Sequence, residues 1–330
     1  MVADSKKKKE RLIFDLVYAD RSFDEIKDFE NPDFLLRYFP KDPYFGVEVT
    51  EQYLSETNAR IDNISGYSGQ LLNGGVFKHK DDRKVINITE IDIIDRNGCV
   101  HAKNISSIMQ ELPPPAKCAS DLANRIISKS NLLQSFPTKL SHTNLIVKDN
   151  TGLLRIINKK NFYKTYFIPE VIKAISSAPF REIFLVTVLQ DEHVYVPLKM
   201  LHLLAEVFLF NGALIQNGYE KKLSIDIDFA ELFAAYLNSN CEYGVLIHKG
   251  IKDTEVIFGD SGIVINPDKS VAVRLHMDYP IDSNASPPSL EWRAILGERF
   301  IDSMNEYRKS NIFSTEACFP VKQSSTQQQL

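Results

Sequence analysis

Two short apolar runs that each carry one carboxylate constrain the fold of this chain more than any other feature. They read NPDFLL over residues 31–36 and YFGVEVTE over residues 44–51. Both are rich in strand-forming residues, and a strand turns alternate side chains to opposite faces, so we expect two adjacent strands. A charge among core-facing residues needs a counter-charge or a metal. Asp33 and Glu48 are therefore a candidate divalent-cation site, unless both are strand-end acids that face water.

The spacing Pro-Asp-Phe, a hairpin-length gap and Gly-Val-Glu-Val-Thr resembles the metal-dependent nucleases of the PD-(D/E)xK, or restriction-endonuclease-like, superfamily. The resemblance implies that Asp33 and Glu48 hold Mg²⁺, for which Mn²⁺ can substitute, with the backbone carbonyl of Val49 as a further ligand. The last position of the second motif is usually a lysine in that superfamily, and here it is Thr50. Superfamily members can carry this lysine elsewhere in the site, so the departure bears on activity more than on fold.

An acid in the first predicted helix is a third candidate ligand. Residues 5–19 show a helical apolar stripe, and Glu10 lies three and seven residues before Ile13 and Val17, at the head of that stripe. The resemblance implies that such an acid completes the site. The alternative is an ordinary acid at a helix start, favoured there by the helix dipole. The lysines at 6–9 are interpreted as a solvated helix end, with phosphate attraction as the second reading.

Two lysines could supply the cation that Thr50 lacks. In the helix predicted from about residue 118 to 135, Lys129 falls in the middle of the apolar stripe, where it either snorkels outward or reaches the carboxylates. The resemblance favours Lys129, because some members of the superfamily carry their lysine on this helix. Lys80 is the second choice, on one side of a strand if residues 76–83 are extended. The alternative for Lys80 is a solvated charge cluster.

The order of the remaining elements predicts a mixed α/β sheet covered by helices on both faces. Strands are expected at 143–147 and 182–189, and helices at 168–177 and 198–210. A hairpin is expected around the Asn97-Gly98 turn. We expect a core over residues 1–215, restriction-endonuclease-like by resemblance, and a polar, disordered tail over residues 321–330.

Residues 216–320 are expected to form a C-terminal α+β extension or subdomain. The predicted elements are a helix at 228–239, strands near 243–248, 254–258, 262–266 and 270–275, and a last helix over 290–309. Asp228 is interpreted as a helix cap rather than as a metal ligand paired with Asp226.

Composition restricts the class of protein without naming the substrate. The net charge of −4 argues against a wholly basic protein that coats nucleic acid, although local patches can still bind phosphates. The four cysteines lack metal-type spacing and are expected to be reduced thiols. No apolar signal region follows the first lysines, and the longest apolar segment, 196–215, contains charged residues. We expect a cytoplasmic protein with no membrane partner.

Other catalytic motifs are missing from the sequence. It has no Walker loop, dinucleotide fingerprint or nucleophile elbow, and its seven histidines are interpreted as ordinary surface or core residues. We therefore expect a Mg²⁺-dependent nuclease acting on DNA or RNA, in restriction or phage defence by family habit and with dimerisation open. The alternatives are an inactive member that binds nucleic acid or a partner protein, or an interaction protein in which the three residues Asp33, Glu48 and Lys129 lie apart.

Overall fold

The computed structural model describes residues 2–133, 139–219, 228–239, 244–266, 270–310 and 318–321. The chain divides into two compact units, one made of residues 1–52 and 119–330 and the other of residues 53–118. The predicted boundary after residue 215 falls inside the first unit. The predicted tail, apart from residue 321, lies outside the described residues.

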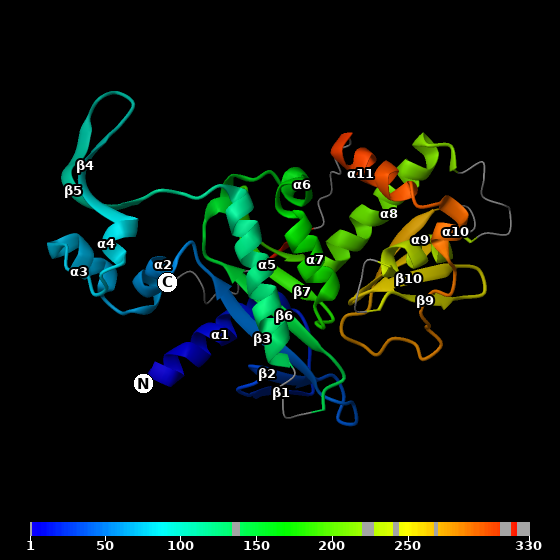
Figure 1. Ribbon diagram of the computed structural model, residues 1–330. Helices are drawn as coiled ribbons and strands as arrows, with labels where there is room; N and C mark the ends of the chain where they lie inside the picture. The colour runs from blue at the N-terminus through cyan, green and yellow to red at the C-terminus, as the bar shows by residue number, and fades with distance from the viewer. Residues whose placement is uncertain are drawn as a thin grey trace. The chain divides into compact units, whose positions relative to one another are not determined.

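A mixed sheet organises the first unit. Among the described residues it has seven strands in the order β1-β2-β3-β6-β7-β8-β13 (Figure 1). The strands are β1 (Glu25–Asp28), β2 (Phe34–Arg37), β3 (Phe45–Gln52), β6 (Thr143–Asp149), β7 (Ile183–Leu189), β8 (Glu192–Pro197) and β13 (Phe319–Pro320). β3, β6 and β7 run parallel, and the other neighbours pair antiparallel. The predicted mixed sheet is confirmed, although β1, β8 and β13 were not predicted.

Helices flank this sheet, and their apolar faces explain where they pack. The first helix, α1 (Val2–Tyr18), places Phe14 and Val17 in one buried cluster with Val47 and Val49 of β3. Because side chains alternate along a strand, Glu48 points to the opposite face, where α5 (Pro115–Leu132) brings Lys129 to it. The alternation in β3 thus puts the apolar cluster on one face and Glu48 on the other.

Two longer helices and several short ones complete the layers. They are η2 (Leu153–Ile156), η3 (Lys159–Asn161), α6 (Phe162–Tyr166), α7 (Pro169–Ser177) and α8 (Leu198–Gln216). Among the described helices α8 alone is long and apolar enough to cross a membrane, and 72% of its apolar window is buried inside the protein. That burial is typical of a core helix.

A second, antiparallel sheet lies in the same unit, in the order β12-β11-β10-β9. Its strands are β9 (Leu246–Lys249), β10 (Thr254–Phe258), β11 (Ser261–Ile265) and β12 (Val271–Leu275). Asp228 caps α9 (Phe229–Asn238) by accepting the Ala230 N–H at 2.8 Å, as predicted, while Asp226 lies outside the described residues.

The single helix predicted over 290–309 is wrong. The chain forms α10 (Trp292–Leu296) and α11 (Phe300–Ser310) instead. Gly297 ends α10 with φ at +79°, a conformation that glycine adopts without steric cost.

The second unit holds α2 (Glu56–Asn63), α3 (Tyr67–Gly74), α4 (Asp82–Val85) and the hairpin of β4 (Ile86–Ile94) with β5 (Val100–Gln110). The hairpin around Asn97-Gly98 is confirmed. An extended segment over residues 76–83 is wrong, because this stretch turns into α4. The turn buries Asp82, whose carboxylate accepts hydrogen bonds from Thr57, Arg60 and Tyr67.

Candidate functional site

An ion pair links the second acidic strand to the predicted lysine helix. Lys129 Nζ, on α5, donates to Glu48 Oε1, on β3, at 2.6 Å. The Glu48 side chain is 6% exposed and that of Lys129 is 20% exposed, so the lysine reaches a largely dry carboxylate from the edge of the site. Lys129 therefore lies where the sequence placed the cation that Thr50 cannot supply.

The first acid, Asp33, is tied to the same strand. It directly precedes β2, in which Phe34 pairs with Val47 of β3. Its Oδ2 accepts a hydrogen bond from the Val49 backbone N–H at 2.8 Å. Val49, predicted as a ligand, thus contacts Asp33 through its backbone N–H. This bond holds the Asp33 carboxylate beside the residue that follows Glu48 in β3.

The predicted third acid approaches from α1 together with a lysine that the sequence interpretation missed. Lys7 Nζ lies 3.1 Å from Glu10 Oε2 and 3.5 Å from Asp33 Oδ1. It also donates to the Phe29 carbonyl at 2.5 Å. Lys6 Nζ lies 3.1 Å from the other Glu10 oxygen. Lys7 therefore bridges two of the predicted ligands, and the only signal in the sequence was its place one helical turn before Glu10.

Asp33 is buried, and two other carboxylates act on it. Burial, followed by the charge of Glu48 and then that of Glu10, raises the pKa of Asp33 to about 6. The Val49 N–H and Lys7 act in the opposite direction. A hydrogen bond to Glu10 raises the pKa of Lys6, to which the charges of Asp33 and Glu48 also contribute. The acids thus act on one another electrostatically across the site.

Two carboxylate oxygens of the site are left without a hydrogen bond. Glu48 Oε2 and Glu10 Oε2 are buried and accept none from any residue that the structure describes, although Glu10 Oε2 has its ion-pair contact with Lys7. Buried polar atoms in proteins usually have partners, so Glu48 Oε2 points to a missing positive or donor group. Within the described ranges, however, no three His, Cys, Asp or Glu side chains stand close enough together to hold a metal ion.

The structure places Thr50 in the central sheet and Lys80 in the second unit. Thr50 is buried in β3, two residues beyond Glu48. Lys80 is exposed and belongs to the unit of residues 53–118, whereas the cluster is built entirely from the first unit. The structure thus brings together Asp33, Glu48, Glu10 and Lys129, with Val49 as an anchor, and leaves the role of Lys80 a prediction.

The comparisons with known proteins add no relative. No protein-family model, no curated protein and no solved structure matches this chain.

Proposed function

We propose that this protein is a Mg²⁺-dependent nuclease with a restriction-endonuclease-like core, which hydrolyses phosphodiester bonds of nucleic acid, with DNA as the first candidate. The observation that supports it most is the 2.6 Å contact of Lys129 with Glu48, beside an Asp33 bonded to the next residue of the same strand. Two acids and a lysine from three separate segments of the chain make the combination that metal-assisted phosphodiester hydrolysis needs.

The donor set fits a divalent cation in its chemistry. Mg²⁺ prefers carboxylate oxygens, and two such oxygens here are buried without a hydrogen bond. Burial, followed by the charge of Glu48, raises the pKa of Asp33, and a cation bound there would favour its ionised form. Lys7 stands between Glu10 and Asp33, so its ammonium group must turn aside before those two acids can share an ion. Asp33 and Glu48 are the principal ligands in this proposal, and Glu10 joins them after Lys7 moves.

Each residue then has a definite task. A bound Mg²⁺ supplies a water of lowered pKa and neutralises charge on the phosphate. Lys129 has three N–H donors, of which Glu48 takes one, so others are available for the attacking water or a phosphate oxygen. The Val49 N–H holds the Asp33 carboxylate in one orientation. Lys6, largely exposed at the helix start, is available to a phosphate outside the acids.

The test is cleavage of a mixture of DNA and RNA with Mg²⁺, comparing the wild type with Asp33→Asn, which keeps the size of the side chain and an acceptor for the Val49 N–H. We expect cleavage by the wild type and a loss of at least about a hundredfold in the variant, the scale on which a catalytic electrostatic contact acts. Equal rates, or cleavage by neither protein, would overturn the nuclease assignment. Binding of nucleic acid without cleavage would favour the inactive, binding form of the fold.

A further inference from the structure

A cavity of about 520 Å³ lies in the first unit, apart from the acid cluster. Aromatic and proline side chains make much of its wall, together with Ser141, His142, Arg181 and Asp278. Cavities of this size with apolar walls and a few convergent polar groups are typical of small-molecule sites. Phe45, which lines the cavity, and Glu48 lie on opposite faces of β3 by strand alternation. None of the described residues that line the cavity belongs to the acid cluster, so the cavity is separate from the proposed nuclease site.

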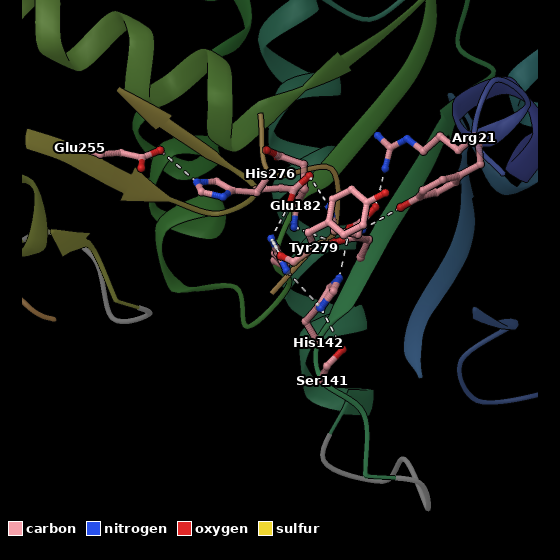
Figure 2. Close-up of polar contacts among 12 residues, drawn as sticks. Arg21, Ser141, His142, Glu182, Glu255, His276 and Tyr279 are labelled. Atoms are coloured by element: carbon pink, nitrogen blue, oxygen red, sulfur yellow. Dashed lines mark hydrogen bonds and ion pairs between the residues drawn. The ribbon is translucent and has the colours of Figure 1, made fainter. Parts of the chain in front are cut away.

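The imidazole of His142 is fixed in the cavity wall. Its ring stacks on Phe45 with centroids 4.8 Å apart and planes 9° apart. Its Nε2 lies 3.1 Å from Asp278 Oδ1, a contact between positions 136 residues apart in the chain. Figure 2 shows the His142 ring beside Ser141, and the distances place Ser141 Oγ at Nδ1 and the Asp278 carboxylate at Nε2. Stacking and the carboxylate contact together fix the orientation of both ring nitrogens.

Asp278 is a buried carboxylate held by several donors. Its side chain is 0% exposed and also accepts from Arg21 Nη1 and Asn144 Nδ2, each at 2.5 Å. Burial favours the neutral acid, but the hydrogen bond from His142 and the charge of Arg21 hold the pKa of Asp278 below its ordinary value. Asp278 and Met277 both have positive φ, +66° and +50°. Non-glycine residues keep such backbone conformations only where the surroundings enforce them, and these often lie at functional sites.

The neighbours of His142 decide which ring nitrogen carries the proton. Arg181 Nη1 lies 3.4 Å from His142 Nδ1, and a guanidinium can only donate, so Nδ1 presents its lone pair. Nε2 then carries the hydrogen and donates it to Asp278. Burial lowers the pKa of His142, which keeps the ring neutral near pH 7. Ser141 Oγ lies 3.1 Å from the same nitrogen, so Arg181 must release the Nδ1 lone pair before that nitrogen can accept the serine proton.

We propose that Ser141, His142 and Asp278 form a nucleophile, base and orienting acid that hydrolyse small carboxylic esters with an apolar or aromatic group. Such a triad is recognised by geometry and roles rather than by sequence order. Here the serine faces Nδ1 and the acid faces Nε2. The Arg181 guanidinium pairs with Asp260 at 2.8 Å and lies beside Nδ1, and in this proposal it leaves Nδ1 to donate to the ester carbonyl oxygen as charge develops there.

The reaction balances with water as the co-reactant. Ser141 Oγ bonds to the ester carbonyl carbon while its proton passes to His142 Nδ1, and the imidazolium returns that proton to the leaving alkoxide as the carbon–oxygen bond breaks. Water then attacks the acyl-serine and gives one proton to His142, which passes it back to Ser141 Oγ as the acid leaves. The products are one carboxylic acid and one alcohol, and no electrons are exchanged.

The alternative is that Ser141 and His142 form only a local hydrogen bond between adjacent residues. Ser141 Oγ also donates to the Tyr44 carbonyl at 3.3 Å, which fits that alternative. Reaction with a fluorophosphonate, followed by mass spectrometry, separates the two readings, because only an activated serine takes the label at neutral pH. Hydrolysis of p-nitrophenyl butyrate gives the rate. The variants are Ser141→Ala and, as a matched control, Ser68→Ala, an exposed serine of α3.

We expect the label on Ser141 and at least about a hundredfold slower ester hydrolysis in Ser141→Ala, with Ser68→Ala unchanged. Asp278→Asn is expected to slow hydrolysis at least about tenfold, provided its thermal melt shows a folded protein. If Asp278→Asn does not fold, Ser141→Ala decides alone. Absence of label on Ser141, or equal hydrolysis by Ser141→Ala and the wild type, would overturn the proposal.

Discussion

Lys7 is the residue whose position most changes the interpretation of the acid cluster. Its ammonium group lies within 3.5 Å of both Glu10 and Asp33, the place that a shared cation would take. Charge repulsion and occupancy both set this lysine against a divalent ion. In the proposed site, Lys7 therefore competes with a divalent ion for Glu10 and Asp33.

Lys7→Met should raise the affinity for Mn²⁺ roughly three- to tenfold, because a partly exposed ion pair contributes on the order of 1 kcal/mol and its loss removes the competition. Lys6→Met is the matched control, since Lys6 touches Glu10 but its side chain is 76% exposed. Isothermal titration with Mn²⁺ measures both constants. Equal affinities for wild type and Lys7→Met would show that the lysine does not compete.

Asp33 gives the metal-free protein a predictable pH dependence. Its folded pKa of about 6 exceeds the ordinary 3.8, so between these values the folded state keeps a proton that the unfolded chain has lost. Its stabilising contribution is present below about pH 4 and is lost as the pH rises through about 6. Asp33→Asn should therefore raise the free energy of unfolding by about 1–3 kcal/mol near pH 8 and leave it unchanged near pH 3.5. Urea unfolding at both pH values, without metal, measures this. A loss of stability near pH 8 would contradict it.

For single residues, the sequence predicted which side chains carry charge in the acid cluster better than it predicted which side chains contact one another. The carboxylates of Asp33 and Glu48 stood out because charge in an apolar strand demands a partner, and Lys129 because a lysine interrupted an apolar stripe. Lys7 was missed because it lies in a run of four lysines. The sequence does not distinguish these lysines from one another, and only the packing of α1 brings Lys7 to the acids. His142 showed no pattern at all, since Asp278 reaches it from 136 residues away.

At the scale of the elements, the pairing of β2 with β3 depends on a glycine. A Cβ at Gly46 would lie 2.6 Å from Pro32 Cγ and 2.8 Å from Leu140 Cδ1. Pro32 directly precedes Asp33, so the close approach of these two segments sets the distance between the first acid and β3. Gly46 is thus a structural requirement of the acid cluster.

Gly46→Ala should cost about 1–3 kcal/mol of stability, the scale of overpacking in a filled core, and should weaken Mn²⁺ binding by displacing Asp33. Gly69→Ala is the control, because a Cβ there meets nothing within 4 Å and alanine favours the helix α3. Thermal unfolding and Mn²⁺ titration report the two effects. A Gly46→Ala protein as stable as the wild type would show that the strands can shift without cost.

Strong periodic segments were predicted well as elements, and weak ones were not. β6, β7 and α8 followed from continuous apolar runs, and the β4–β5 hairpin from its Asn97-Gly98 turn. β1 and β8 were missed because Glu25–Asp28 and Glu192–Pro197 begin with acids and are only partly buried. The break between α10 and α11 depends on the left-handed backbone of Gly297, which an apolar pattern does not reveal.

At the scale of the molecule, two compact units should respond separately to mutation. In the unit of residues 53–118, Asp82 is fully buried and accepts a hydrogen bond from Arg60 Nη2 at 2.6 Å. Asp82→Ala leaves the partners Arg60, Thr57 and Tyr67 without their acceptor and should cost this unit about 3–5 kcal/mol. Hydrogen exchange by mass spectrometry should show faster exchange in residues 53–118 and unchanged exchange in β3 and β6. Faster exchange in both units would mean that the chain unfolds as one.

The division into units was the part of the architecture that the sequence predicted least. The extension predicted over residues 216–320 contains the second, antiparallel sheet, yet that sheet belongs to the same compact unit as the central one. Residues 53–118 form the other unit, although no boundary was predicted at either end of this segment. Unit boundaries follow from long-range packing, which local patterns do not contain.

Binding of a divalent cation by the acids around Asp33 and Glu48 can be measured by a Mn²⁺ titration followed by electron paramagnetic resonance. Glu48→Gln removes the charge while keeping the shape of the side chain and an oxygen for Lys129. We expect saturable Mn²⁺ binding to the wild type and at least about tenfold weaker binding to Glu48→Gln. No saturable binding to the wild type, or equal binding to both proteins, would contradict it.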